Sequence, residues 1–444
     1  MRAPRKAADG GGGASRRPAA WVAAAIILLL LGVWVWRPGG GQGPAGAPQA
    51  DESARAGPPA EQVPGFEVEA PVAILADAET GQVLYAKNPD APVHPASLVK
   101  VMTLLVALDA VEQNFASLGD PVRASAHAEA MGGSQVYLSA GEVHSLEKLL
   151  RAIAIASAND ASVAVAEHIA GTEAAFVRMM NRRARELGMT GTTFVNSHGL
   201  PPEAGQDPNL TTARDVVTMS RELIRRHPVV LEWTSIQREV FRERPRFVLE
   251  NTNRLIGTYQ GADGLKTGFT QDAGYSLAAT ASRDGRRLIA VVMGASSDEA
   301  RVLQAQRLLD LGFRAYRPVT VALEGEKVGT LRLRTGQPEA VAVRAAQTLR
   351  VLTLGGDTSG VSRRVEFRQG LAPPVKEGEA VGWVVALLHG QEVARAPVLS
   401  ERAMGRASGL TAFGRWLRNL LGALVPGTGG LATGLGLRRA PGPS

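Results

Sequence analysis

A serine and a lysine three residues apart, Ser97 and Lys100, are the residues whose types and spacing most directly suggest chemistry. On a helix this spacing places both side chains on one face, about one turn apart. A serine hydroxyl becomes a strong nucleophile only when a neighbouring group accepts its proton. A lysine can accept it when burial or a second cation lowers its pKa. Residues 98–111 are apolar almost all round, so we expect a buried helix that desolvates Lys100.

A second motif, Ser157-Ala158-Asn159, is the only Ser-x-Asn in the chain. Residues 145–170 have helical periodicity that is broken near this motif. Two polar side chains at such a break can project together into a cleft. Ser157 could then relay protons and Asn159 could hold a substrate amide. The alternative is that Asn159 or Asp160 only caps the next helix.

The Ser-x-x-Lys pattern also occurs at Ser145 and Lys148, where a different explanation is better. Ser145 is expected to be the N-cap of an amphipathic helix. It precedes Ser157 by twelve residues, roughly 18 Å along a continuous helix. Ser145 and Ser157 are therefore not expected to share a pocket.

A third motif, Lys266-Thr267-Gly268, is the only Lys-Thr-Gly and precedes two strand-like runs at 275–281 and 288–294. A lysine on an edge strand can be the second cation that lowers the pKa of Lys100, and it can attract a substrate carboxylate. A glycine there lets a substrate backbone approach. A similar triplet, Arg-Thr-Gly at 334–336, lies in the predicted β domain and has no partner motifs near it in the required order.

The three motifs, separated by 60 and 109 residues, together form the signature of penicillin-interacting serine enzymes. The chain resembles the low-molecular-mass penicillin-binding proteins of the D-alanyl-D-alanine carboxypeptidase family over about 66–315. The stretches that carry this resemblance are 96–103, 131–134, 196–201 and 263–275. The layout beyond them, a β domain and an amphipathic anchor, is also similar to that family.

The resemblance implies a role for each motif residue. It implies that Ser97 is acylated and that Lys100 is its base. The assisting network would comprise Ser157, Asn159 and Lys266. No metal ion and no organic cofactor is expected. His198 belongs to a structural loop in the family, so no catalytic role is expected for it.

The resemblance also implies a substrate-binding strand formed by Lys266, Thr267, Gly268 and Phe269. Thr267 would bind the terminal carboxylate of the substrate. The backbone N–H groups of Ser97 and Phe269 would form the oxyanion hole. Arg301 matches the position of a carboxylate-binding arginine in the family.

The function that this resemblance implies is removal of the terminal D-alanine from peptidoglycan stem pentapeptides, through an acyl-enzyme on Ser97. The partners would be the D-Ala-D-Ala end of the stem peptide and, as covalent inhibitors, β-lactam antibiotics. A D,D-endopeptidase that cuts crosslinks would use the same residues and stays open. A class A β-lactamase is disfavoured because the chain has no Glu-x-x-Leu-Asn loop. A non-catalytic wall-associated protein is disfavoured because the motif residues are intact.

The fold class expected is an α/β transpeptidase/β-lactamase-like domain, an antiparallel sheet flanked by helices with an all-helical insertion, followed by a small all-β domain. A hairpin is predicted at 72–77 and 82–86, and helices at 174–187, 215–226 and 298–311. Short β-like runs separated by Gly and Pro predict the second domain. Those runs lie at 330–333, 348–354, 361–367 and 381–388.

Composition shifts divide the chain into six predicted segments. They are a signal peptide or membrane anchor (1–38), a Gly/Pro/Ala linker (39–64), the catalytic domain (65–317), the β domain (318–400), an amphipathic membrane-associating helix (401–426) and a disordered tail (427–444). The apolar run 21–36 follows two arginines and indicates export. Whether it is cleaved or retained stays open.

Charge and cysteine content limit the possible partners and sites. The net charge of +7 divides into +5 in residues 1–50, −3 in 51–400 and +5 in 401–444. A slightly acidic centre is not typical of a nucleic-acid-binding protein. Basic ends favour an anionic membrane surface. The chain has no cysteine, which excludes thiolate chemistry. We therefore expect an extracytoplasmic protein attached to the outer face of the cytoplasmic membrane.

Overall fold

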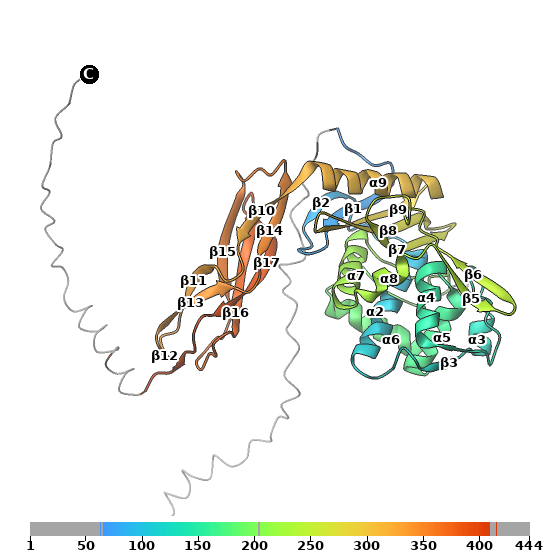
Figure 1. Ribbon diagram of the computed structural model, residues 1–444, viewed down its shortest axis with the longest axis horizontal. Coiled ribbons are helices and arrows are strands. Elements are labelled where there is room, and N and C mark those ends of the chain that lie inside the picture. Colours follow the sequence, from blue (N-terminus) through green and yellow to red (C-terminus); the bar gives the residue numbers. More distant parts are fainter. Residues whose placement is uncertain (1–62, 64, 203–204, 409–413, 415–444) are drawn as a thin grey trace, which may run out of the picture. The chain divides into compact units, whose positions relative to one another are not determined.

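The computed structural model describes residues 63, 65–202, 205–408 and 414 (Figure 1). The predictions for 1–38 and 427–444, almost all of 39–64 and most of 401–426 concern residues outside this described part. Among the residues that are described, no helix has both the length and the apolar character that crossing a membrane requires.

The part of the chain predicted to be catalytic is built on one five-stranded antiparallel sheet. Its strands, in spatial order, are β2 (Val83–Lys87), β1 (Val72–Asp77), β9 (Arg286–Ala295), β8 (Gly274–Arg283) and β7 (Ala262–Thr270). The predicted hairpin is confirmed as β1 and β2. Strand β1 also pairs with β9, where Val72 lies opposite Met293. Strand β7 lies at the edge, as predicted for the strand with Lys266.

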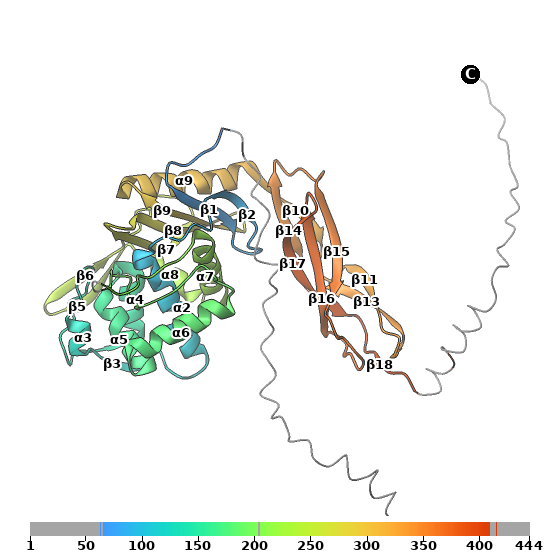
Figure 2. The ribbon, with the colours of Figure 1, turned by 180° about the vertical axis from the view of Figure 1, so that it is seen from behind.

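The two faces of the sheet bury separate hydrophobic cores, because successive side chains of a strand point to opposite sides. Ile74 and Val291 pack on one face with the helices that follow β2. Leu75 and Ala290 pack on the other face with α9 (Asp298–Ala315). Figures 1 and 2 show α9 alone on its face and the group of helices on the other.

The helical subdomain occupies the chain between β2 and β7. Its helices are α2 (Val99–Glu112), α3 (Ala126–Glu129), α4 (Leu146–Ala156), α5 (Asn159–Ala170), α6 (Glu173–Glu186), α7 (Ala213–Arg226) and α8 (Val229–Thr234). The expectation that this insertion is all-helical is wrong. It contains two short strand pairs, β3 (Pro121–Arg123) with β4 (Val143–Ser145) and β5 (Arg238–Glu243) with β6 (Arg246–Glu250). The β5–β6 hairpin buries Phe241 and Leu249 in the same core as the helices.

Helix α2 is buried on every side, in agreement with its apolar sequence. All its residues from 99 to 110 are buried. Helix α4 is capped as predicted, since the Ser145 side chain accepts a hydrogen bond from the Lys148 N–H. This cap explains the second Ser-x-x-Lys pattern without catalysis.

The C-terminal β part begins directly after α9. It contains a five-stranded sheet in the order β11 (Lys327–Arg332), β13 (Ala340–Ala345), β17 (Gln391–Ser400), β16 (Ala380–Leu388) and β15 (Val361–Phe367). Two smaller pairs complete it, β10 (Tyr316–Ala322) with β14 (Leu349–Leu354) and β12 (Gly336–Gln337) with β18 (Gly405–Arg406). Its core is separate and includes Val343, Val384 and Val398.

Candidate active site

The predicted nucleophile lies two residues before α2 begins. Ser97 belongs to the short 3₁₀ helix η2 (Ala96–Leu98). Ala96 has φ of 48°, in the left-handed region that non-glycine residues rarely adopt. The turn leads directly into the buried α2, so Ser97 is fixed at the helix entrance while Lys100 lies inside it.

The buried amine of Lys100 lies among three oxygen atoms. Its Nζ is 3.0 Å from Ser97 Oγ, 2.7 Å from Asn159 Oδ1 and 2.5 Å from the carbonyl oxygen of His198. Residues from three separate segments therefore converge on this one amine. The predicted pairing of Ser97, Lys100 and Asn159 is present in the structure.

Electrostatics favour the uncharged form of this amine. Lys100 is 0% exposed. Burial, and next the charge of Lys266, hold the pKa of Lys100 well below its usual value, against an opposing effect of Asp160. Burial, and next the charge of Arg301, lower the pKa of Lys266 to about 7. The charge of Lys266 thus opposes protonation of Lys100, as the sequence predicted.

The break between α4 and α5 brings Asn159 to Lys100. Ser157 ends α4 with φ of 62° and is buried. The backbone N–H of Asn159 donates to the Ser134 carbonyl and its Nδ2 donates to the Gly132 carbonyl, both at 2.7 Å. The Oδ1 of Asn159 is thereby directed at Lys100. The Ser157 hydroxyl has no hydrogen-bond partner among the described residues.

The alternative that Asn159 or Asp160 only caps α5 is wrong. The N-cap position is Ala158, which has no side-chain cap. The Asp160 carboxylate accepts hydrogen bonds from the N–H groups of Val136 and Leu138. Asp160 therefore fixes the segment after Gly132 that holds Asn159 in place.

Strand β7 lies against the turn that contains the nucleophile, and Gly268 makes this contact possible. A Cβ added at Gly268 would lie 2.9 Å from the Pro95 oxygen and 3.3 Å from the Ser97 nitrogen. Lys266 is 1% exposed, and its Nζ donates to the Thr267 carbonyl oxygen. The lack of a side chain at 268 keeps β7 beside Ser97.

Thr252, which the sequence analysis did not select, lies next to Thr267. The Thr267 hydroxyl donates to the Thr252 hydroxyl at 2.7 Å, and the Thr252 N–H donates to the Ile155 carbonyl. Asn251 and Asn253 secure this turn through Nδ2 hydrogen bonds to backbone carbonyl groups. A threonine in an irregular loop has no sequence signature that would identify this contact.

Arg301 and Phe269 both lie near the end of β7, where each contacts the ring of Tyr275. Arg301 Nη1 donates to the Gly268 and Ser276 carbonyl groups, and Nη2 lies 2.5 Å from the carboxylate of Asp298. The buried Nε of Arg301 has no hydrogen-bond partner among the described residues. Phe269 is 50% exposed, and its ring stacks on Tyr275. Both residues thus lie at the motif strand, and their expected roles, a carboxylate-binding arginine and an oxyanion-hole N–H, stay predictions.

The His198 ring is committed to its own loop, in agreement with the structural role expected for it. Its Nδ1 accepts the Leu200 N–H, and its Nε2 lies 3.6 Å from Glu173. Burial, against the opposing charge of Glu173, lowers the pKa of His198 to about 4. The contribution of this residue to the site is its backbone carbonyl, an atom that no residue-type pattern can predict.

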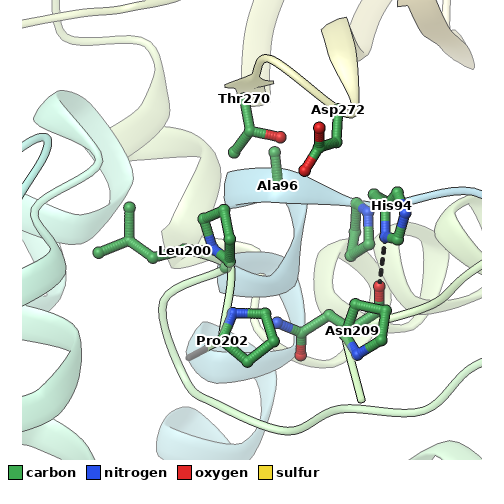
Figure 3. A pocket seen from close by; sticks show the side chains of 11 residues that line it. His94, Ala96, Leu200, Pro202, Asn209, Thr270 and Asp272 are labelled. Atoms are coloured by element: carbon green, nitrogen blue, oxygen red, sulfur yellow. Dashed lines mark hydrogen bonds between the residues drawn. The ribbon is translucent and has the colours of Figure 1, made fainter. Parts of the chain in front are cut away.

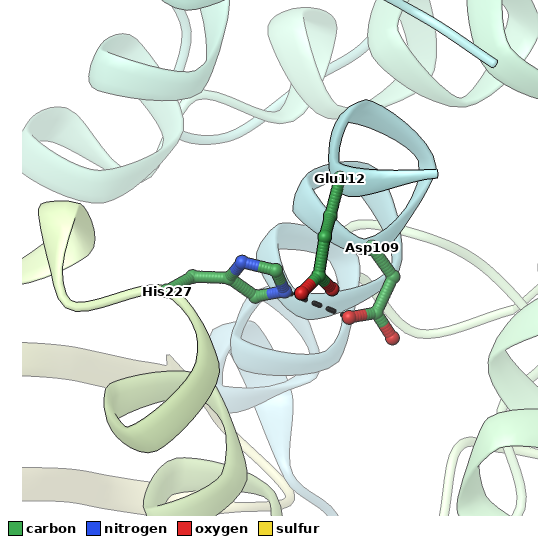
Figure 4. A group of neighbouring side chains, drawn as sticks. All are labelled: Asp109, Glu112 and His227. Atoms are coloured by element: carbon green, nitrogen blue, oxygen red, sulfur yellow. Dashed lines mark hydrogen bonds and ion pairs between the residues drawn. The ribbon is translucent and has the colours of Figure 1, made fainter. Parts of the chain in front are cut away.

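One cluster of potential metal ligands lies within the described residues, at Asp109, Glu112 and His227 (Figure 4). Asp109 is nine residues after Lys100 on α2, roughly 14 Å along the axis. The Asp109 carboxylate already lies 2.9 Å from Arg183 Nε and 3.2 Å from Arg226 Nη1. Since two guanidinium groups neutralise it, this cluster is an ion-pair network that joins α2, α6 and α7.

Comparisons with known proteins agree with this geometry. Residues 57–297 match the family described as D-alanyl-D-alanine carboxypeptidase, and residues 316–406 match the C-terminal domain of penicillin-binding protein 5. The chain is 36% identical over 346 residues to the D-alanyl-D-alanine carboxypeptidase DacF of Bacillus subtilis, covering 77% of this chain and 88% of that protein. It is 34% identical to DacC of Escherichia coli, covering 75% and 83%.

Solved structures give the same result. Penicillin-binding protein 5 from Haemophilus influenzae aligns with a TM-score of 0.67 and 30% identity, covering 78% of this chain and all of that one. Penicillin-binding protein D2 from Listeria monocytogenes, solved in an ampicillin-bound form, aligns with a TM-score of 0.52 and 35% identity over 57% of this chain and all of that one. The chain therefore belongs to the D-alanyl-D-alanine carboxypeptidase family of serine peptidases, the low-molecular-mass penicillin-binding proteins.

Proposed function

We propose that the protein is a serine-type D-Ala-D-Ala carboxypeptidase that removes the terminal D-alanine from peptidoglycan stem pentapeptides. The observation that carries this proposal is the fully buried Lys100 amine, 3.0 Å from the Ser97 hydroxyl and with a lowered pKa. Only an uncharged amine can accept the serine proton at neutral pH. The substrate class, peptides that end in D-alanyl-D-alanine, is taken from the names of the relatives.

In the first step Ser97 Oγ attacks the carbonyl carbon of the penultimate D-alanine, and its proton moves to Lys100 Nζ. The backbone N–H groups of Ser97 and Phe269 stabilise the oxyanion that forms. The C–N bond then breaks. The proton passes to the leaving amine, with the Ser157 hydroxyl as relay, and free D-alanine departs. An ester between Ser97 and the remaining peptide is left.

In the second step a water molecule gives a proton to Lys100 and attacks this ester. Lys100 then returns the proton to Ser97 Oγ as the ester C–O bond breaks, which releases the shortened peptide and restores both residues. Asn159 holds a substrate amide during both steps. Thr267, assisted by Lys266 and Arg301, binds the carboxylate of the terminal D-alanine. A β-lactam would acylate Ser97 in the same way, because its ring amide mimics the scissile dipeptide. No step requires a metal ion or an organic cofactor.

Assay of D-alanine release tests this proposal and separates it from the D,D-endopeptidase alternative. The purified chain is incubated with a stem pentapeptide and, separately, with a crosslinked muropeptide dimer that lacks free D-Ala-D-Ala ends. We expect D-alanine from the pentapeptide and no monomer from the dimer. Cleavage of the dimer alone would favour the endopeptidase. Cleavage of neither would support a non-catalytic wall-associated protein.

We further propose that the enzyme works outside the cytoplasm, attached to the outer face of the cytoplasmic membrane, in peptidoglycan maturation, cell-wall remodelling and cell shape. The basic and apolar sequence of 1–38 supports export. In 401–426, apolar residues at helical spacing opposite Arg415 and Arg418 support an interfacial anchor. The relatives' substrate also lies outside the cytoplasm, which agrees with this location.

A further inference from the structure

A pocket opens immediately beside the nucleophile turn, and the mechanism described above does not use it (Figure 3). Three segments line it: the chain before Ser97, the loop after His198 and the end of β7 with its turn. Most of its wall is apolar. That wall comprises Pro95, Ala96, Leu200, Pro201, Pro202 and Pro208.

Asp272 carries the one carboxylate among the residues that line this pocket, and the other polar side chains are those of His94, Asn209 and Thr270. Figure 3 shows the Asp272 carboxylate directed from the β7–β8 turn toward Ala96. Asp272 has no hydrogen-bond or ion-pair partner in the part of the chain that the structure describes. His94 Nδ1 faces the Asn209 carbonyl oxygen at 3.3 Å and can donate a hydrogen bond to it.

The Asn209 side chain is already hydrogen-bonded within the protein. Its Oδ1 accepts the Val195 N–H and its Nδ2 donates to Asn196 Oδ1. The carboxylate that a ligand would meet is that of Asp272, which is exposed and lies beside the apolar wall of the pocket. This combination suits an aliphatic chain that ends in a cation.

The direction of the bound substrate places one particular residue at this pocket. This step rests on the proposed function, in which the terminal carboxylate lies at Thr267 and the oxyanion lies at Phe269. Thr267 and Phe269 are two residues apart on β7, so these two contacts fix the direction in which the peptide runs along the strand. The part of the substrate upstream of the scissile bond must then continue past Thr270 toward Asp272, antiparallel to β7.

We propose that this pocket binds the side chain of the residue immediately before D-Ala-D-Ala, and that it selects an aliphatic side chain ending in a free, positively charged amine. The Asp272 carboxylate pairs with the amine, and the prolines and Leu200 contact the methylene groups. The preferred substrate is accordingly a stem peptide whose side-chain amine is not yet crosslinked.

Two soluble peptides that differ only at this amine test the inference. One is Nα-acetyl-L-lysyl-D-Ala-D-Ala, and the other carries a second acetyl group on the lysine side chain. At low ionic strength we expect the wild type to have about threefold higher kcat/KM for the free amine, the size of a partly exposed ion pair. Added salt should reduce this preference. The Asp272→Asn variant should lose it.

The matched control is Asp284→Asn, which removes an exposed aspartate from the β8–β9 turn at the other end of β8. Asp284 has φ of 51°, which asparagine also tolerates. We expect this variant to keep the wild-type preference and both variants to keep wild-type labelling by fluorescent penicillin. An equal preference in wild type and Asp272→Asn, or no preference in the wild type, would overturn the inference. Cleavage of neither peptide by labelled wild type would overturn the proposed function and this inference with it.

Discussion

The two buried lysines explain how a serine can be activated here without a histidine base. Lys100 lacks contact with water and faces a second amine, Lys266, so its proton is lost more easily than that of an ordinary lysine. Lys266 in turn is close enough to Arg301 for that charge to lower its own pKa to about 7. The active arrangement has Lys100 neutral and Lys266 protonated.

The pH dependence of kcat/KM should therefore be bell-shaped. Activity should rise with pH as Lys100 loses its proton, and fall as Lys266, with a pKa of about 7, loses its own. In Lys266→Arg the guanidinium stays protonated, so the falling limb should move far to higher pH while the rising limb remains. The measurement is kcat/KM for the pentapeptide across the pH range in which the protein stays folded.

Lys148→Arg is the control for this experiment, since it makes the same change in the other Ser-x-x-Lys pattern. Its pH profile should match that of the wild type. A falling limb with the same midpoint in Lys266→Arg and in the wild type would contradict the assignment of that limb to Lys266.

When a substrate carboxylate is bound, we expect the Thr252 hydroxyl to donate to the Thr267 hydroxyl, which then donates its own proton to the carboxylate. Thr252→Val keeps the shape of the side chain and removes its hydrogen bond. A net hydrogen bond is worth about 1 kcal/mol, so we expect KM for the pentapeptide to rise about fivefold with kcat nearly unchanged. Steady-state kinetics measure both constants.

Thr252→Ser should restore the wild-type KM because it returns the hydroxyl. Thr258→Val makes the same change at an exposed site in the same loop and should have no effect. A fall in kcat without a rise in KM would show that Thr252 does not act through substrate binding.

Among the elements, the contact between β7 and η2 determines whether the motifs can act together. Gly268→Ala would place a methyl group 2.9 Å from the Pro95 oxygen, so either the turn or the strand must move. Misplacement of reacting groups by about 1 Å can cost 10²-fold in rate. We expect penicillin acylation to slow by about that factor, as measured by stopped-flow or gel-based labelling.

Gly119→Ala is a suitable comparison because its added Cβ would meet only Ser117 Oγ at 4.0 Å. It should acylate at the wild-type rate. Thermal unfolding of both variants checks that each is folded. If Gly268→Ala acylated normally, close packing of β7 on η2 would not be required for catalysis.

The sequence predicted these elements where periodicity was strong and missed them where charges interrupted it. The buried helix α2 was predicted from its apolar run. The break between α4 and α5 was predicted from the polar residues near Ser157. The β5–β6 hairpin was missed, because Arg238 and Glu243 bound a strand whose only fully buried side chain is Phe241. Strand β13 was missed because its alanines have little strand preference.

The backbone atoms that complete the site could not be predicted from any pattern of residue types. The carbonyl groups of Gly132 and His198 contact Asn159 and Lys100 through the backbone, which every residue type has. Their positions depend on tertiary packing. The pairing of β1 with β9 is a similar case, because alternation within a strand does not identify a partner more than two hundred residues away.

At the scale of the whole molecule, the two basic ends of the chain predict attachment to a membrane. We expect the full chain to sediment with vesicles that contain anionic phosphatidylglycerol, and less so at high salt. A chain that ends at residue 408 should bind at least tenfold more weakly, because basic residues contribute about 1 kcal/mol each near such a surface. Vesicle co-sedimentation measures both.

A chain that begins at residue 65 separates the contribution of the N-terminal segment. It should keep the binding that 401–426 provides and lose any that 1–38 adds. Both truncated chains should still be labelled by penicillin, since neither lacks a motif residue. Equal vesicle binding by the full chain and by the chain ending at 408 would contradict an anchor in 401–426.

The most direct test of the account is covalent labelling by a fluorescent penicillin, followed by peptide mapping of the adduct. We predict that the wild type carries one label, on Ser97, and that Ser97→Ala carries none. Ser145→Ala, in the other Ser-x-x-Lys pattern, should be labelled like the wild type and lose only the roughly 1 kcal/mol of its helix cap. A label that persists in Ser97→Ala, or that maps to another residue, would contradict the account.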